Sequence, residues 1–114
     1  MGPKPRGIAR KRQAFAPIFA ALGDETRLAL IDRLRDGEAQ SISQLAEGWP
    51  ITRQAITKHL KVLEEAGLVQ MSRAGRESLF ELTPQPLAEV RDYLDFVSTE
   101  WDQALLRLKA FVED

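Results

Sequence analysis

Cysteine is absent from the 114-residue chain, and histidine occurs only once. Without cysteine there can be no disulfide framework, no thiolate metal site and no cysteine nucleophile. This composition fits a reducing compartment. No apolar run approaches the roughly 20 residues of a membrane span. The basic N-terminal segment has no apolar signal core, so we expect a cytoplasmic protein without a membrane partner.

A large net charge is also absent, but the charge that the chain carries is unevenly distributed. The total is −1. Residues 1–13 carry +5 and residues 52–80 carry +2, whereas residues 14–51 carry −3 and residues 81–114 carry −5. The basic side chains therefore gather in two segments, and such clusters are typical of contact with a polyanion.

Apolar stripes and turn residues alternate along the chain in a pattern that predicts a mainly α fold with a small β-hairpin. The expected helices lie at residues 15–22, 24–36, 44–47, 52–66 and 84–112, and two strands lie at 69–73 and 77–82. This order is that of a winged helix-turn-helix domain. We expect a flexible basic tail at 1–13, the winged helix-turn-helix domain at 14–84, and a dimerisation helix at 85–114 within the same structural domain.

Single residues predict where these helices begin and end. Asp24 is expected to cap the second helix, with Leu28, Ile31 and Leu34 on its buried face. Ser43 is expected to cap the third helix and Thr52 the fourth, which Gly67 would end.

Residues 52–66 form an amphipathic helix when they are placed at about 100° per residue. One arc is polar and basic and consists of Arg53, Gln54, Thr57, Lys58 and Lys61, while the opposite arc is apolar apart from His59. Glu64 and Glu65 come later in the helix, where we expect it to leave the groove. Arginine and glutamine have forked hydrogen-bonding groups that match guanine and adenine edges. Phosphate contacts are expected from Thr52, Thr57, Lys58 and Lys61.

A solvated charged face would give the same periodicity. The short helix and tight turn before this segment, and the basic hairpin after it, favour DNA reading. Arg73 and Arg76 flank the hairpin turn and could lie along a minor groove. The alternative for them is a solubilising edge turn.

Three separated motifs resemble the ArsR/SmtB family of winged-helix regulators. Residues 51–69 have the sequence ITRQAITKHLKVLEEAGLV, residues 21–27 have ALGDETR, and Gly75-Arg76 is followed by LFELTP at 79–84. The match covers roughly residues 15–84, in the family's order.

The resemblance implies a homodimeric, operator-binding regulator, usually a repressor that an inducer releases. It implies major-groove contacts by Arg53, Gln54, Thr57 and Lys58, and wing contacts by Arg73 and Arg76.

Metal-sensing members of that family use cysteine motifs, or histidine and carboxylate pairs on terminal helices. The single histidine, His59, instead lies in the recognition segment. It could contact a phosphate or act as a pH switch, or it could be a partly buried residue at the helix seam. The helical position favours the seam. Glu89, Asp92 and Asp95 could hold a hard ion, but a solvated acidic face is the simpler interpretation. We therefore expect no metal and no cofactor, as in the metal-independent branch.

The last expected helix repeats apolar or small residues at alternating spacings of three and four. The repeat consists of Leu87, Val90, Leu94, Val97, Trp101, Ala104, Leu108 and Phe111. Such a heptad seam predicts a partner helix. The expected homodimer contacts are Phe15, Phe19, Leu87, Val90, Leu94, Val97, Trp101, Leu105 and Leu108. Packing within one chain is the alternative, and Trp101 with Tyr93 could instead line an effector pocket.

The leading hypothesis is a sequence-specific transcriptional regulator, a homodimeric repressor that binds double-stranded DNA at an inverted repeat and answers to an inducer of unknown identity. The alternative is a winged-helix module that binds proteins and not DNA. We expect no catalytic residues, because the chain has no cysteine, no partners for a histidine-based triad and no glycine-rich phosphate loop.

Overall fold

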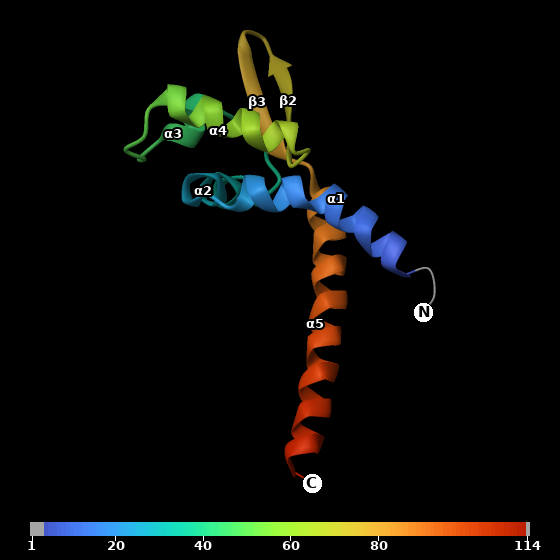
Figure 1. Cartoon of the computed structure of the whole chain (residues 1–114). Helices are drawn as coiled ribbons and strands as arrows, with labels where there is room; N and C mark the ends of the chain where they lie inside the picture. The colour runs from blue at the N-terminus through green and yellow to red at the C-terminus, as the bar shows by residue number, and fades with distance from the viewer. Residues whose placement is uncertain (1–3, 114) are drawn as a thin grey trace. The chain divides into compact units, whose positions relative to one another are not determined.

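The computed structural model describes residues 4–113 (Figure 1). Its elements are α1 (Lys4–Leu22), α2 (Glu25–Arg33), β1 (Gln40–Ser41), α3 (Ile42–Ala46), α4 (Arg53–Glu65), β2 (Val69–Ala74), β3 (Glu77–Leu82) and α5 (Pro84–Glu113). The chain divides into two compact units, one up to Pro84 and one from Gln85. The mainly helical fold with a small sheet agrees with the prediction from the sequence.

Helix α1 begins much earlier than predicted, at Lys4 instead of Phe15. Residues 4–13 of the expected tail are helical in the structure, while residues 1–3 lie outside the described residues. Seven of these ten residues are arginine, lysine, glutamine or alanine, which are good helix formers even without an apolar stripe. Further along, Phe15, Ile18 and Ala21 are buried at spacings of three along one face of the helix.

Helix α2 begins as predicted, and of the three residues expected on its buried face Leu34 is buried, Ile31 is half-buried and Leu28 is exposed. The Asp24 carboxylate accepts a hydrogen bond from the Arg27 backbone N–H at 3.1 Å, which confirms the cap. Leu30 and Leu34 are fully buried, whereas Leu28 is 51% exposed. The prediction for Leu28 was wrong because Leu28 lies about 200° around the helix from Leu30.

Helix α3 is capped by Ser41, and the prediction of Ser43 was wrong. The Ser41 hydroxyl accepts from the Gln44 backbone N–H at 3.1 Å, and the Gln44 side chain accepts from the Ser41 backbone N–H at 2.8 Å. This reciprocal pair needs glutamine or glutamate three residues after the cap, and Ser43 has no such partner. Residues 40–41 also form the short strand β1, which the sequence did not reveal and which pairs with β3 at Phe80 and Leu79.

The recognition segment and the wing follow their predicted boundaries closely. Thr52 caps α4 by accepting from the Ala55 backbone N–H at 3.1 Å, and Gly67 has φ +80 just after the helix. Strands β2 and β3 pair antiparallel from Val69↔Leu82 to Ala74↔Glu77. Gly75 has φ +64 and Arg76 a negative φ, the pattern of a type II′ turn. The hairpin extends beyond α3 and α4 in Figure 1.

The core of the first unit fixes the inner face of α4. Its fully buried large side chains are Leu30, Leu34, Leu45, Ile56, Leu60, Leu63 and Leu68. They come from α2, α3, α4 and the segment after α4, so three helices share one apolar centre. The single sheet, in the order β1-β3-β2, extends from this helical core. Helix α5 of the second unit is long and mostly exposed. Among the described residues, no helix is long and apolar enough to span a membrane.

Candidate nucleic-acid interface

Helix α4 has one buried face and one exposed polar face. Ile56, Leu60 and Leu63 have no exposed surface. The exposed side chains of the opposite face are Arg53, Gln54, Thr57, Lys58 and Lys61 on the first three turns, followed by Glu64 and Glu65 at the end of the helix. Four of these, Arg53, Gln54, Thr57 and Lys58, line a shallow depression on the first two turns. The structure therefore places side by side the residues that the sequence predicts as base and phosphate contacts.

The two threonines of this face use their hydroxyl groups differently. Thr52 Oγ1 accepts the Ala55 N–H, so its own proton is still available to a phosphate oxygen. Thr57 Oγ1 donates its only proton to the Arg53 carbonyl at 2.8 Å. Thr57 therefore presents a methyl group and lone pairs. These suit a base edge better than the phosphate contact that was also expected of Thr57.

The basic side chains of α4 and the wing are free of acidic partners. No carboxylate of the described residues lies within ion-pairing distance of Arg53, Lys58, Lys61, Arg73 or Arg76. All five are exposed. Arg73 lies on β2 opposite Ser78, and Arg76 lies in the hairpin turn. These cations are thus available for an anionic partner.

His59 lies on the inner side of α4 in a polar junction with α2. Its side chain is 25% exposed, which matches the predicted place at the helix seam. Its Nδ1 is 3.2 Å from Arg27 Nη1 and 3.8 Å from an Asp24 carboxylate oxygen. Because arginine only donates, His59 Nδ1 can accept from Arg27 only when this nitrogen carries no proton. Arg27 Nε also donates to the Ala21 carbonyl at the end of α1.

The same junction perturbs the carboxyl group of Asp24. The hydrogen bond from the Arg27 backbone N–H is the largest cause, and the charges of Arg27 and His59 act in the same direction. Together they lower the pKa of Asp24 below its ordinary value, against the opposing effect of desolvation.

Sequence reasoning missed a second junction, at the turn between α3 and α4. Arg33, in the last turn of α2, donates to the Leu45 and Glu47 carbonyls and lies over the Trp49 ring. Its partners are 12 to 16 residues away along the chain, so no local periodicity could identify them.

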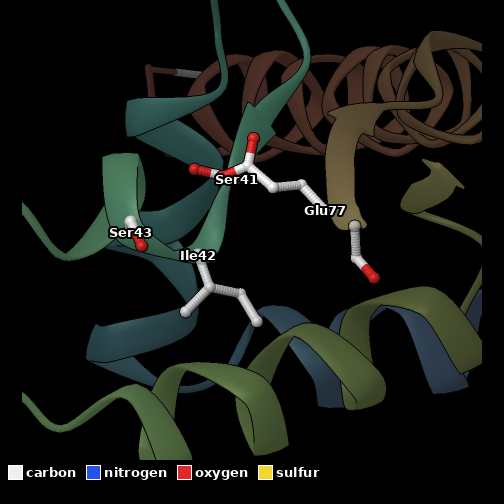
Figure 2. A pocket seen from close by; sticks show the side chains of 5 residues that line it. Ser41, Ile42, Ser43 and Glu77 are labelled. Carbon is white, nitrogen blue, oxygen red and sulfur yellow. The ribbon is translucent and has the colours of Figure 1, made fainter. Parts of the chain in front are cut away.

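A small pocket near the sheet does not belong to the basic face. It is lined by Ser41, Ile42, Ser43, Glu77 and Ser78, and Figure 2 shows it from close by. The Glu77 carboxylate would repel a phosphate, and Ser41 already caps α3. This pocket therefore adds nothing to a nucleic-acid interface.

The residues expected at a dimer interface differ in exposure. Phe15 and Val90 are buried in the single chain and have little surface left for a second copy. Leu87 and Val97 are half-buried. The exposed members are Phe19, Leu94, Trp101, Leu105 and Leu108.

No metal site is evident in the part of the chain that the structure describes, where no group of three or more histidine or carboxylate side chains converges. Glu89 instead accepts from the Gln85 side chain at 3.3 Å.

These features define a winged helix-turn-helix protein with an exposed basic recognition helix. A sequence profile described as a helix-turn-helix domain matches residues 22–71. The regulator Rv2034 of Mycobacterium tuberculosis is 40% identical over 87 residues, which cover 76% of this chain and 78% of that protein. The repressor SmtB of the same organism is 30% identical over 103 residues, 90% of this chain and 72% of that protein.

A solved structure gives the same result. An ArsR-like transcriptional regulator from Rhodococcus sp. RHA1 superposes with a TM-score of 0.76 at 37% identity, and the match covers 89% of this chain and 94% of that one. The chain therefore belongs to the ArsR/SmtB family of helix-turn-helix transcriptional regulators, as the motifs predicted. It is a transcriptional regulator and not an enzyme.

Proposed function

We propose that the protein represses transcription by binding an inverted-repeat operator as a homodimer. The observation that carries this proposal is the exposed face of α4, where forked and cationic side chains lie opposite a fully buried apolar face. A relative named as a repressor supports repression as the regulatory outcome. DNA of a prokaryotic cell lies in the cytoplasm, so this function also places the protein there.

The proposed contacts follow the order of residues along α4. Arg53 and Gln54, at the N-terminal end of the helix, enter the major groove and read base edges. The partial positive charge of the helix N-terminus adds to their attraction for DNA. Lys58 and Lys61, further along, hold phosphates and fix the register. At the wing, Arg73 and Arg76 lie along the neighbouring minor groove.

The proposed dimer depends on α5. Large apolar side chains are exposed along this helix, with Trp101 at 64%, and water-exposed stripes of this kind mark interaction surfaces. Four of them, Leu94, Trp101, Leu108 and Phe111, belong to the apolar repeat with spacings of three and four, which suits a partner helix of the same kind. Phe19 on α1 is a further exposed contact. Two copies related by a two-fold axis would read half-sites about 34 Å apart. An inducer would act by favouring another spacing of the two recognition helices.

Selection of duplexes from a random-sequence pool by the purified protein tests the proposal. We expect an inverted repeat to emerge. Arg53→Ala should then weaken binding to the selected duplex by about 1–3 kcal/mol and relax the preference at one base pair of each half-site. The matched variant Arg35→Ala removes an exposed arginine from the turn after α2 and should leave that preference unchanged. A pool that yields no common sequence would favour the alternative, a module that binds proteins.

A further inference from the structure

One guanidinium makes three contacts with the turn that leads into the recognition helix. Arg33 Nη1 donates to the Leu45 carbonyl at 3.1 Å and to the Glu47 carbonyl at 3.2 Å. The guanidinium carbon lies 4.4 Å from the centroid of the Trp49 ring. The Arg33 backbone is held in turn, because the Gln40 side chain donates to its carbonyl at 2.7 Å.

The two carbonyls lie where a helix end needs partners. The last carbonyls of a helix have no donor within the helix, and a cation nearby also suits the negative end of the helix dipole. Leu45 belongs to the last turn of α3, and Glu47 is its C-cap with extended backbone angles. The chain then turns through Gly48, at φ +69, and reaches the cap of α4 at Thr52.

We propose that Arg33 is a positioning residue for DNA recognition, which sets the direction in which α4 leaves the turn. The proposal rests on the proposed function, because it concerns where Arg53 and Gln54 point in a groove. The buried residues Ile56, Leu60 and Leu63 hold the inner face of α4 further along the helix. Arg33 instead fixes the turn just before the N-terminal end of α4, where Arg53 and Gln54 lie.

The chemistry of the site requires arginine. A planar guanidinium can offer both hydrogens of one nitrogen to two carbonyls while its flat face stacks on an indole ring. A lysine ammonium keeps the charge but cannot combine a planar stack with that fixed pair of hydrogen bonds. Arg33→Lys therefore separates geometry from charge.

The turn that follows α2 supplies a matched control. Arg35 lies two residues after Arg33 and pairs only with the exposed Asp32 carboxylate, at 2.9 Å. Substitution of Arg35 removes the same charge from nearly the same place without touching the turn. Charge effects on DNA affinity are thus common to both positions, and effects through the turn are specific to Arg33.

The experiment compares affinity for two duplexes of equal length and composition: one selected from a random pool by the wild-type protein, and one scrambled. Arg33→Ala and Arg33→Lys should lose about ten- to a hundredfold in affinity for the selected duplex, the size of one lost bidentate base contact. Affinity for the scrambled duplex should fall less than about twofold, as it should for Arg35→Ala with both duplexes. Trp49→Phe keeps a ring face and should largely preserve the ratio of the two affinities, whereas Trp49→Ala should lower it.

A spectroscopic signal reports the contact itself. Protein labelled with 5-fluorotryptophan should give two ¹⁹F resonances, of which Trp49→Phe removes one. Arg33→Lys should shift that resonance and leave the other in place, while Arg35→Ala should shift neither. Thermal unfolding of each variant, followed by circular dichroism, ensures that affinities are compared on folded protein.

Four outcomes would overturn the proposal. Wild-type affinity for both duplexes in Arg33→Lys would show that charge alone matters. An equal fall for both duplexes in the Arg33 variants would assign Arg33 to stability or non-specific attraction. If the Arg33 variants fail to fold, an unchanged ratio of the two affinities in Trp49→Ala would contradict the proposal. If the wild-type protein selects no sequence, the proposed function itself falls, and this proposal falls with it.

Discussion

At the scale of single residues, Thr57 shows how a local hydrogen bond limits what a side chain can offer to DNA. Its hydroxyl proton is committed to the Arg53 carbonyl, which leaves the methyl group as the part best suited to a base. Thr57→Ser should therefore weaken binding to the selected duplex by about 0.8 kcal/mol, the value of one buried methyl-sized group. Thr57→Val keeps the methyl group and should bind nearly as well as the wild type in fluorescence anisotropy. A larger loss in Thr57→Val than in Thr57→Ser would assign the contact to the hydroxyl.

Asp24 couples the stability of the first unit to acid pH. Its pKa in the folded state is lowered, chiefly by the Arg27 backbone N–H. Stability from this group is therefore complete above the pKa of the unfolded chain, and it is lost as the pH falls through the folded-state pKa. Asp24→Asn keeps a capping oxygen but does not titrate. Its thermal midpoint should thus fall less than that of the wild type between pH 5 and pH 2. Parallel curves for the two proteins would contradict this account of Asp24.

At the scale of helices and strands, the cap of α3 gives a further prediction. Ser41 is buried and exchanges two hydrogen bonds with Gln44, whereas Ser43 is exposed. Ser41→Ala should lower the free energy of unfolding by about 0.5–2 kcal/mol, as loss of a cap does. Ser43→Ala should change it by less than about 0.5 kcal/mol. Urea unfolding at equilibrium measures both, and equal values would argue against the capping box.

The elements that sequence patterns predicted well are those whose signals are local. Thr52 and Gly67 bound α4 because a cap and a positive-φ glycine act on adjacent residues. Strand β1 was missed because two residues carry no periodicity, and its pairing partner, Phe80, is 40 residues away. The early start of α1 was missed because the prediction followed the apolar stripe from Phe15 and not the helix propensity of the residues before it.

The candidate site shows the same division between local and distant signals. The exposed face of α4 follows from helical spacing alone, so its basic and amide side chains were found. The junctions of Arg27 with His59 and of Arg33 with Trp49 depend on how helices pack, and packing has no signature within a short window of sequence.

At the scale of the whole molecule, the exposed stripe of α5 predicts the oligomeric state. Leu94→Asp combined with Trp101→Asp places charges on the proposed seam and should give monomers in light scattering. These monomers should bind the selected inverted repeat weakly, because each would hold only one half-site. Leu106 is equally exposed but lies off the heptad, so Leu106→Asp should remain dimeric. A dimeric double variant would reject the seam.

The salt dependence of DNA affinity reports how many copies of the protein bind one operator. Each phosphate contact contributes a slope of about −0.9 to the logarithm of affinity against the logarithm of salt concentration. Lys58 is exposed on α4 and has no acidic partner among the described residues. Lys58→Gln removes one contact from each copy, so a bound dimer should lose about 1.8 units of slope and a bound monomer about 0.9. Arg35→Gln, which removes a charge from the turn after α2, should leave the slope nearly unchanged. A slope that Lys58→Gln does not alter would place this lysine away from the phosphates, whatever the oligomeric state.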